Sequence, residues 1–153
     1  MAMVKQVLFC IGEETYGVEV THVKGIEKYL NMVPIPNAPS YIEGIINLRG
    51  DIIPIISMRV KFGLPKKDVT EDTKLIIVKS KDVLIGVEVD SVQEIVEIAE
   101  EDISQPPVII KNDKTSYIDK VAHVNDGLVI LLDLDGILSN QEQESLQQLL
   151  KEV

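Results

Sequence analysis

The chain has 153 residues, of which 45% are hydrophobic, only 4% are aromatic and none is tryptophan. This is enough apolar material for one ordinary domain with a packed core of valine, isoleucine and leucine, which favour strands. The net charge of -10 argues against the concentrated positive surface that nucleic acids and anionic membranes require.

The single cysteine, Cys10, makes an intrachain disulfide impossible and is compatible with a reducing compartment. It lies in the apolar run 7–11, where we interpret it as a small buried hydrophobe. No signal-peptide pattern is visible, and no apolar stretch approaches the ~20 residues that span a membrane. We therefore expect a soluble, cytoplasmic protein.

Residues 16–26 (YGVEVTHVKGI) and 85–95 (IGVEVDSVQEI) form an internal repeat at an offset of 69, with six of eleven positions identical. The repeat predicts one small β unit built twice. In chain order, each copy should have an apolar first strand (7–9 or 76–78), a polar turn, an alternating strand (16–20 or 83–89) and a third strand through Val23 or Val92.

A proline-bearing connection follows in each copy, at residues 31–40 and around Pro106 and Pro107. A tight turn then leads into an apolar strand at 52–56 or 128–132, and one helical turn is expected at 58–62 or 134–138. The offset has grown to 76 by this point, which predicts an insertion in copy two near residues 112–116.

We predict an all-β domain over residues 1–153, with five-stranded subdomains at about 5–65 and 74–138. The charged segment 64–73 joins the two subdomains. A short C-terminal helix is expected at 140–152, because Ser139 and Glu142 have the spacing of a capping box. Its apolar face, formed by Leu146, Leu149, Leu150 and Val153, should pack on a barrel, with docking of a partner as the alternative.

The sequence contains no recognisable catalytic site. His22 and His123 are far apart in the sequence, and no HExxH, CxxC, GxSxG or phosphate-binding glycine motif occurs. The acidic residues Glu97, Glu100, Glu101 and Asp102 lack the spacing of a calcium loop and are predicted to be a solvated loop. We therefore expect no enzyme activity, no cofactor and no metal.

Residues 44–50 (GIINLRG) place Asn47 and Arg49 in an otherwise apolar run of an acidic protein. One interpretation is a turn whose arginine pairs with Asp51 or a nearby glutamate. The other is an interface anchor, because arginine is enriched at interaction hot spots and binds carboxylates bidentately. The sequence leaves both open.

The run 46–63, INLRGDIIPIISMRVKFG, is similar to the signature of the CheW family, the coupling proteins of bacterial chemotaxis. The family pattern has an Asn-Leu-Arg-Gly turn, an apolar strand with a proline, an Asp-Leu-Arg-like segment and a Phe-Gly close. The similarity extends over residues 5–150. The chain departs from it at Ser57, where the family usually has aspartate, and a hydroxyl accepts a hydrogen bond without offering the charge.

The resemblance implies two five-stranded SH3-like barrels packed side by side, in agreement with the repeat. It implies a non-catalytic adaptor that couples chemoreceptors to the histidine kinase CheA in signalling arrays. Such a protein joins membrane receptor arrays through its partners, without inserting into the membrane. Its expected partners are the receptor's cytoplasmic hairpin tip, held in a groove where the barrels meet, and the regulatory domain of CheA, held at an end of a barrel.

A helix in a groove needs apolar knobs with a polar rim. For the receptor contact we predict Val20, Val23, Ile26, Glu27, Gly44, Asn47, Arg49, Val87 and Val89. Some of these valines must instead face a barrel core, and alternation does not say which. For the kinase contact we predict Met58, Arg59, Val60 and Phe62, with core packing as the alternative for Phe62.

Three other interpretations remain open. The first is the coupling module of a CheV-like protein, whose added receiver domain we do not expect because the sequence ends at Val153. The second is a small barrel that binds nucleic acid, which the acidic charge and the few aromatic residues disfavour. The third is an enzyme of an unrecognised kind.

Overall fold

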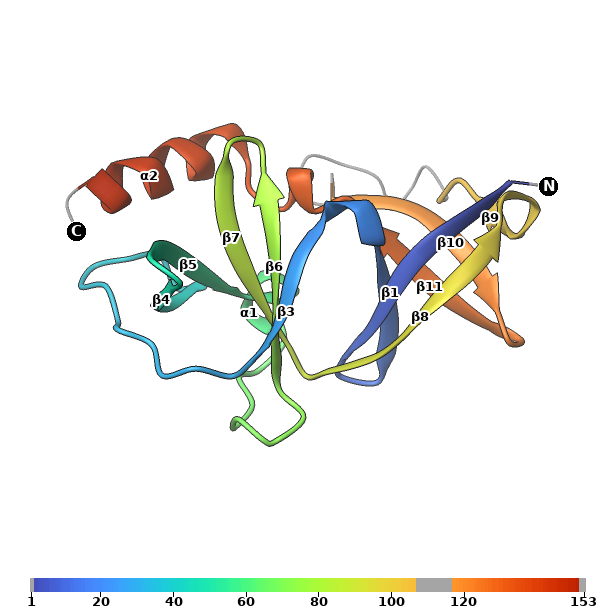
Figure 1. The fold of residues 1–153 in the computed structure, drawn as a ribbon, viewed down its shortest axis with the longest axis horizontal. Helices are drawn as coiled ribbons and strands as arrows, with labels where there is room; N and C mark the ends of the chain where they lie inside the picture. Colours follow the sequence, from blue (N-terminus) through green and yellow to red (C-terminus); the bar gives the residue numbers. More distant parts are fainter. Residues whose placement is uncertain (1, 107–116, 152–153) are drawn as a thin grey trace.

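The computed structural model describes residues 2–106 and 117–151 (Figure 1). The first half contains β1 (Met3–Ile11), β2 (Glu14–Glu19), η1 (Val20–His22), β3 (Val23–Lys28), β4 (Ile42–Leu48), β5 (Asp51–Ser57) and α1 (Met58–Lys61). The second half contains β6 (Lys74–Ser80), β7 (Val83–Val89), β8 (Ser91–Ala99), η2 (Glu100–Asp102), β9 (Ile103–Ser104), β10 (Ile118–Val124), β11 (Gly127–Leu132), η5 (Leu134–Gly136) and α2 (Asn140–Lys151).

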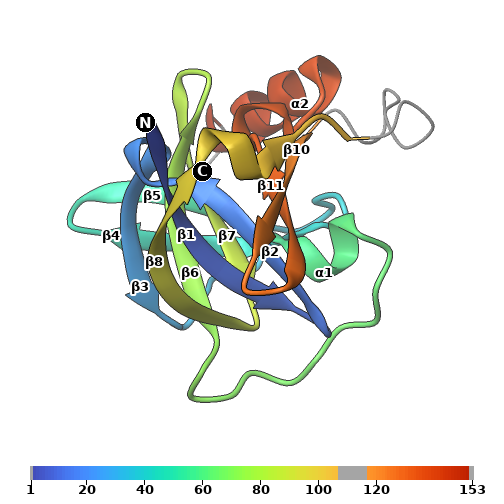
Figure 2. The same ribbon diagram turned by 90° about the vertical axis from the view of Figure 1, so that its right-hand side faces the viewer.

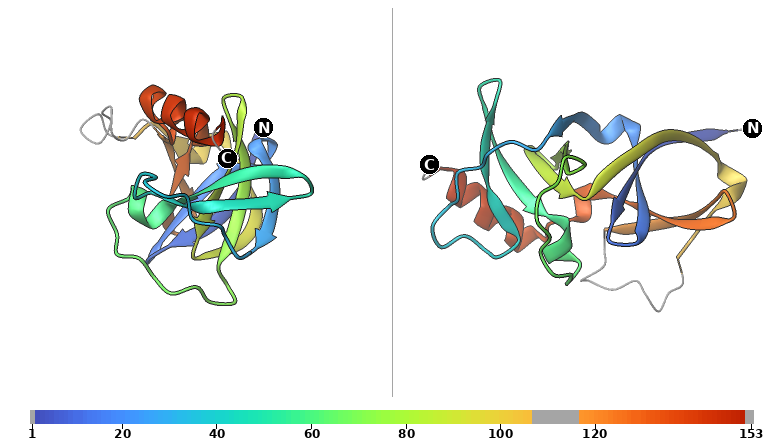
Figure 3. Two further views of the ribbon diagram at one scale, coloured as in Figure 1. Left: turned by 90° about the vertical axis from the view of Figure 1, so that its left-hand side faces the viewer. Right: turned by 90° about the horizontal axis from the view of Figure 1, so that it is seen from below.

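Within the described residues the strands form two sheets that lie side by side along the long axis (Figures 1 and 3). We call them barrel A, with strand order β8-β1-β2-β11-β10-β9, and barrel B, with order β3-β6-β7-β5-β4. The all-β prediction is confirmed, and barrel A has the two-residue β9 as a sixth strand. The connection between β3 and β4 closes barrel B, because its Val33 exchanges two 2.9 Å backbone hydrogen bonds with Ile45 of β4.

Each barrel contains strands from both copies of the repeat. Barrel A joins the β1–β2 hairpin of copy one to the later strands of copy two, and barrel B joins the β6–β7 hairpin of copy two to β3, β4 and β5. The predicted subdomains at 5–65 and 74–138 are therefore wrong as spatial units. The strands were correctly expected, but alternation within a strand does not specify which copy supplies its neighbour.

The first hairpin of each copy is buried on both sides. In β1, Val7, Phe9 and Ile11 face a central core between the barrels, whereas Leu8 lies inside barrel A. In β6, Ile76 and Val78 face the same central core, and Leu75 and Ile77 lie inside barrel B. Strands buried on two faces have continuous apolar runs, which explains why both first strands lack polar alternation.

The C-terminal helix α2 starts as predicted. The Ser139 hydroxyl accepts from the Glu142 N–H at 3.1 Å, and the Glu142 carboxylate accepts from the Ser139 N–H at 3.0 Å, which is a capping box. Leu146 is buried in the central core, and Lys61 of α1 donates to both Glu142 oxygens at 2.8 Å. The predicted insertion near 112–116, Pro107 and Val153 lie outside the described residues.

The repeated glycines Gly17 and Gly86 sit where the two copies meet in parallel strand pairs. Gly17 pairs with Leu131, and Gly86 pairs with Ile55. A Cβ on Gly86 would lie 2.5 Å from Ile55 Cδ1, and one on Gly17 would lie 2.9 Å from Leu131 Cδ2. Both positions are glycine because a side chain from the other copy fills the space.

Gly86→Ala is expected to lower the free energy of unfolding by about 1–3 kcal/mol, because the new methyl group overpacks the interior of barrel B. Ile55→Val removes the atom that clashes, so the double variant should be more stable than the sum of the two single effects. Urea denaturation of all four proteins measures this coupling. Gly25→Ala is the control, since its Cβ would meet only Glu27 at 3.7 Å. Strictly additive losses would contradict the proposed clash.

Candidate functional site

The β4–β5 turn places Arg49 at the end of barrel B. Arg49 and Gly50 have φ values of 51° and 91°, as expected for a two-residue hairpin turn with both central residues left-handed. The Asn47 side-chain oxygen accepts from the Gly50 N–H at 3.1 Å. Asn47 therefore stabilises the turn while remaining exposed.

The Arg49 guanidinium pairs with Glu27 of β3 at 3.2 Å. This confirms a local partner for the arginine, supplied by a glutamate. Because β3 and β4 are the outer strands of barrel B, the ion pair bridges two edges of the same sheet. The Arg49 side chain is still 74% exposed, so most of it faces solvent and the pair contributes little to stability.

Apolar side chains near this turn are divided between surface and core. Ile26, next to Glu27 on β3, is 40% exposed, whereas Val20 and Val23 are half-buried against the central core. Ile95 on β8 is 59% exposed and was not among the predicted contact residues. The repeat offers the signal that would have found it, because Ile95 is the counterpart of Ile26.

Four predicted contact residues are buried and do not form a contact surface. Val87, Val89 and Met58 belong to the central core. Gly44 is buried because β4 passes close to the preceding connection, where a Cβ would lie 2.8 Å from the Val33 carbonyl oxygen. The two valines were expected on a surface because alternation does not show that β7 is covered on both faces, with Val87 and Val89 facing the central core.

The predicted kinase-contact segment, α1, is held mainly by structural contacts. Buried Ser57 caps the helix, since its hydroxyl accepts from the Val60 N–H at 3.3 Å. Phe62 is half-buried between Tyr16 and Tyr117, tilted against the first ring at 5.1 Å between centroids and stacked on the second at 5.6 Å, and it packs against the central core. Val60 is half-buried, and among the described residues it belongs to no hydrophobic core cluster.

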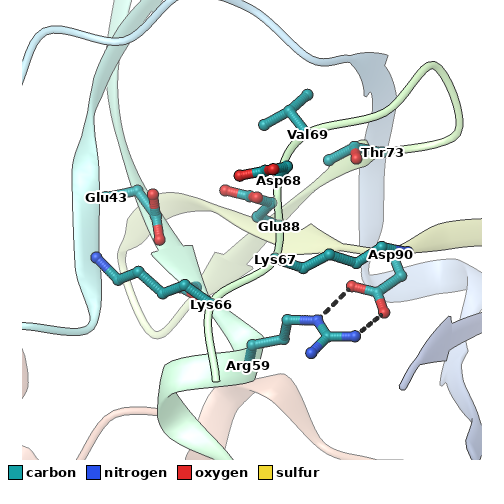
Figure 4. Close-up of a pocket in the computed structure, with 10 residues that line it drawn as sticks. Glu43, Arg59, Lys66, Lys67, Asp68, Val69, Thr73, Glu88 and Asp90 are labelled. Carbon is teal, nitrogen blue, oxygen red and sulfur yellow. Dashed lines mark hydrogen bonds and ion pairs between the residues drawn. The ribbon is translucent and has the colours of Figure 1, made fainter. Parts of the chain in front are cut away.

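Arg59 binds Asp90 through two hydrogen bonds, Nε to Oδ1 at 2.9 Å and Nη2 to Oδ2 at 2.7 Å (Figure 4). Asp90 also accepts from the Gly12 N–H at 2.8 Å, and Gly12 lies in the β1–β2 turn of barrel A. Arg59 and Asp90 are only 20% and 14% exposed. This Asp90 cluster therefore ties α1 and β7 of barrel B to the first hairpin of barrel A.

The charge state of Asp90 follows from these contacts. Burial acts to raise its pKa, but the hydrogen bonds from Arg59 and from the Gly12 N–H outweigh burial, so the pKa lies below its ordinary value. The same pairing raises the pKa of Arg59. Both groups are thus charged over the whole physiological range.

The described residues contain no group of three or more His, Cys, Asp and Glu side chains arranged to hold a metal ion. In the same part of the chain, no helix is long and apolar enough to cross a membrane. The geometry instead presents an exposed arginine turn, exposed isoleucines and a helical turn at the joint of two barrels.

The sequence model of the CheW-like domain matches residues 5–142. The chain belongs to the CheW-like family. It is 33% identical over 147 residues to the chemotaxis protein CheW of Treponema pallidum, covering 94% of this chain and 86% of that protein. It is 29% identical over 141 residues to the CheW of Bacillus subtilis, covering 92% and 90%. The crystal structure of the scaffolding protein TtCheW from Thermoanaerobacter tengcongensis superposes with a TM-score of 0.82 at 34% identity, covering 91% of this chain and 90% of that one.

These comparisons establish the coarse function. The fold and family are those of a chemotaxis coupling adaptor with a scaffolding role. Neither a CheV-like protein nor a nucleic-acid-binding barrel is favoured by them.

Asp90→Asn is expected to lower the free energy of unfolding by about 1.5–3 kcal/mol at pH 7, because it removes charge from a hydrogen-bonded pair. The pKa of Asp90 is lowered in the folded state, so its stabilisation is present above pH ~4 and is lost as the pH falls through the folded value. The difference between wild type and variant should therefore shrink in acid. Urea denaturation from pH 7 downwards tests this.

Glu97→Gln provides the control, since Glu97 and Lys5 form an exposed pair at 4.0 Å. That change should alter stability by less than about 1 kcal/mol. Equal losses in the two variants would show that Asp90 does not join the barrels.

Proposed function

We propose that this adaptor couples the cytoplasmic hairpin tip of a chemoreceptor to the regulatory domain of the histidine kinase CheA, without catalytic turnover. The family membership supports the coupling of chemotaxis components. The observation that carries the receptor assignment is Arg49, which occupies a left-handed turn position and points largely to solvent.

Arg49 is not the residue that its turn prefers. A side chain other than glycine or asparagine in the left-handed region costs about 1–2 kcal/mol. The corresponding turn of barrel A, between β10 and β11, uses Asn125 at φ 49° and Asp126 at φ 64°, residue types that tolerate this conformation. Arginine therefore brings a backbone cost and a weak surface ion pair, which favours selection for a contact with another molecule.

The receptor surface we propose combines this turn with the exposed isoleucines. Ile26 and Ile95 offer apolar area on the outer strands of the two barrels, and Arg49 and Asn47 offer polar groups. A helical hairpin with apolar knobs and carboxylates at its margin is the matching partner, because a guanidinium binds carboxylates bidentately. Glu27 then serves as a positioning residue, holding the guanidinium until a receptor carboxylate competes for it.

The kinase contact we propose is centred on Val60. Met58 of α1 is buried, Arg59 of α1 is bound to Asp90, and Phe62, which follows the helix, contacts the rings of Tyr16 and Tyr117, so these residues fix the helical turn in place. Val60 is the apolar side chain of the predicted set that is left for a partner.

The class of function is tested by co-sedimentation with receptor fragments and CheA. A ternary complex that forms only when this chain is present supports the coupling role. If CheA sediments with the receptor fragment to the same extent without the chain, the proposal is wrong.

Arg49→Asn is expected to preserve or slightly raise stability while weakening receptor capture at least about tenfold, the loss of one charge-assisted contact. The control is Arg49→Asn combined with Asn125→Arg, which keeps composition and net charge but moves the arginine to the turn of barrel A. This double variant should remain deficient in capture. Restored binding, or undiminished binding by Arg49→Asn, would remove Arg49 from the receptor contact.

Val60→Asp is expected to reduce capture of the CheA regulatory domain at least about tenfold, because it buries a charge in an apolar contact. Receptor capture should be unchanged. Leu128→Asp is the matched control, at an exposed leucine near the start of β11 in barrel A. Circular dichroism checks the fold of both variants, and equal effects of the two on CheA capture would count against Val60.

A further inference from the structure

One mouth of barrel B is a polar pocket of about 70 Å³ covered by residues 64–73, which we call the strap (Figure 4). The strap connects α1 to β6 and arches outside the sheets (Figure 2). The pocket is lined by Glu43, Ser57, Arg59, Lys66, Lys67, Asp68, Val69, Thr73, Glu88 and Asp90. The space accommodates water but is too small for a metabolite.

Glu88 places a carboxylate at this mouth. It alternates along β7 with Gly86, which contacts the interior side chains Ile55 and Ile77 of barrel B. Among the described residues, the Glu88 Oε2 atom is buried and has no hydrogen-bond partner. A buried carboxylate oxygen without a donor strongly disfavours the ionised form.

The charged and titratable groups around Glu88 come from every element at the mouth. They are Glu43 on β4, Asp90 after β7, Arg59 on α1, Lys66, Lys67 and Asp68 on the strap, and Tyr29 after β3. Burial, followed by repulsion from Glu43 and Asp90, raises the pKa of Glu88 to about 7, and attraction to Lys66 opposes the shift only partly. Arg59 is already committed to Asp90.

The strap is anchored near both ends. Close to α1, Arg59 donates to the Pro65 carbonyl at 3.0 Å. Close to β6, Thr73 is buried, and its hydroxyl accepts from the Thr70 N–H at 3.0 Å, a bond within the strap itself. The intervening residues 66–69 supply the lysines, the aspartate and the valine that line the pocket. This middle part is thus the section able to move away from the mouth while its ends stay attached.

Proton binding and strap position are linked. With the strap closed, Glu88 is largely buried and its pKa is about 7, whereas the carboxyl group of a hydrated glutamate has a pKa of about 4.3. Repulsion from Glu43 and Asp90, which are not on the strap, persists when the strap opens, so opening removes the part of the shift that burial causes. The closed form therefore holds the proton more tightly than an open form in which water reaches the carboxylate. By linkage, protonation favours closure, and a pH rise through neutrality favours opening.

We propose that the strap is a pH-sensitive cover over the mouth of barrel B, closed when Glu88 carries a proton and open when Glu88 is ionised. This goes beyond partner coupling, because it makes a surface beside α1 dependent on intracellular pH.

Hydrogen exchange of the strap amides in the full chain tests the proposal, with Glu88→Gln as a mimic of the protonated side chain. At pH 8 the amides of residues 66–69 should exchange about tenfold more slowly in the variant than in wild type, the effect of one pKa unit of linkage. At pH 5.5 the two proteins should exchange alike, because wild-type Glu88 is then also protonated. The strap sequence is the same in both proteins, so intrinsic exchange rates cancel.

Glu19→Gln is the matched control, since Glu19 is the repeat counterpart of Glu88 in barrel A and has no strap residue in the pocket beside it. It should leave strap exchange unchanged at both pH values. Equal exchange at pH 8, or the same difference at both pH values, would overturn the proposal. If Glu88→Gln does not fold, strap protection in wild type, corrected for intrinsic rates, must fall between pH 5.5 and pH 8, and constant protection overturns it.

Discussion

The whole architecture depends on two parallel strand pairs, each of which joins a strand of one copy of the repeat to a strand of the other. In barrel A, β2 of copy one lies beside β11 of copy two, and in barrel B, β7 of copy two lies beside β5 of copy one. Gly17 and Gly86 make these pairs possible because each leaves room for a side chain from the other copy. Neither half of the sequence contains a complete sheet, so the joint between the barrels is a shared core and not an interface between two finished units.

This exchange marks the limit of what the sequence predicts. Local patterns were sufficient for the strands, the turns, the capping box of α2 and the family, because each depends on residues close together in the chain. Strand partners depend on contacts between residues far apart in the chain, such as Gly17 with Leu131 and Ile55 with Gly86. The apolar runs 7–9 and 76–78 show no alternation, so periodicity could not assign their faces. Val87 and Val89 lie on the alternating strand β7, and alternation shows that they share a face but not that this face meets the central core.

The two copies also separate what the fold requires from what it only tolerates. Both β-hairpins at the ends of the barrels use two left-handed residues, so the geometry of the turn is common to the copies. Barrel A meets this requirement with Asn125 and Asp126, and barrel B meets it with Arg49 and Gly50. Since the turn itself gains nothing from a guanidinium, the difference between the copies is evidence about binding that a single barrel would not have provided.

The segment that identifies the family consists mainly of residues with structural roles. Within residues 46–63, Ser57 caps α1, Met58 fills the central core, Arg59 holds Asp90 and Phe62 contacts two tyrosine rings. Ser57 performs its capping role without a negative charge, and the carboxylate that faces Arg59 comes from Asp90, directly after β7. A motif can therefore identify an adaptor through residues that build its scaffold, and the residues that choose its partners must be sought among the few that the scaffold leaves exposed, with Arg49 first among them.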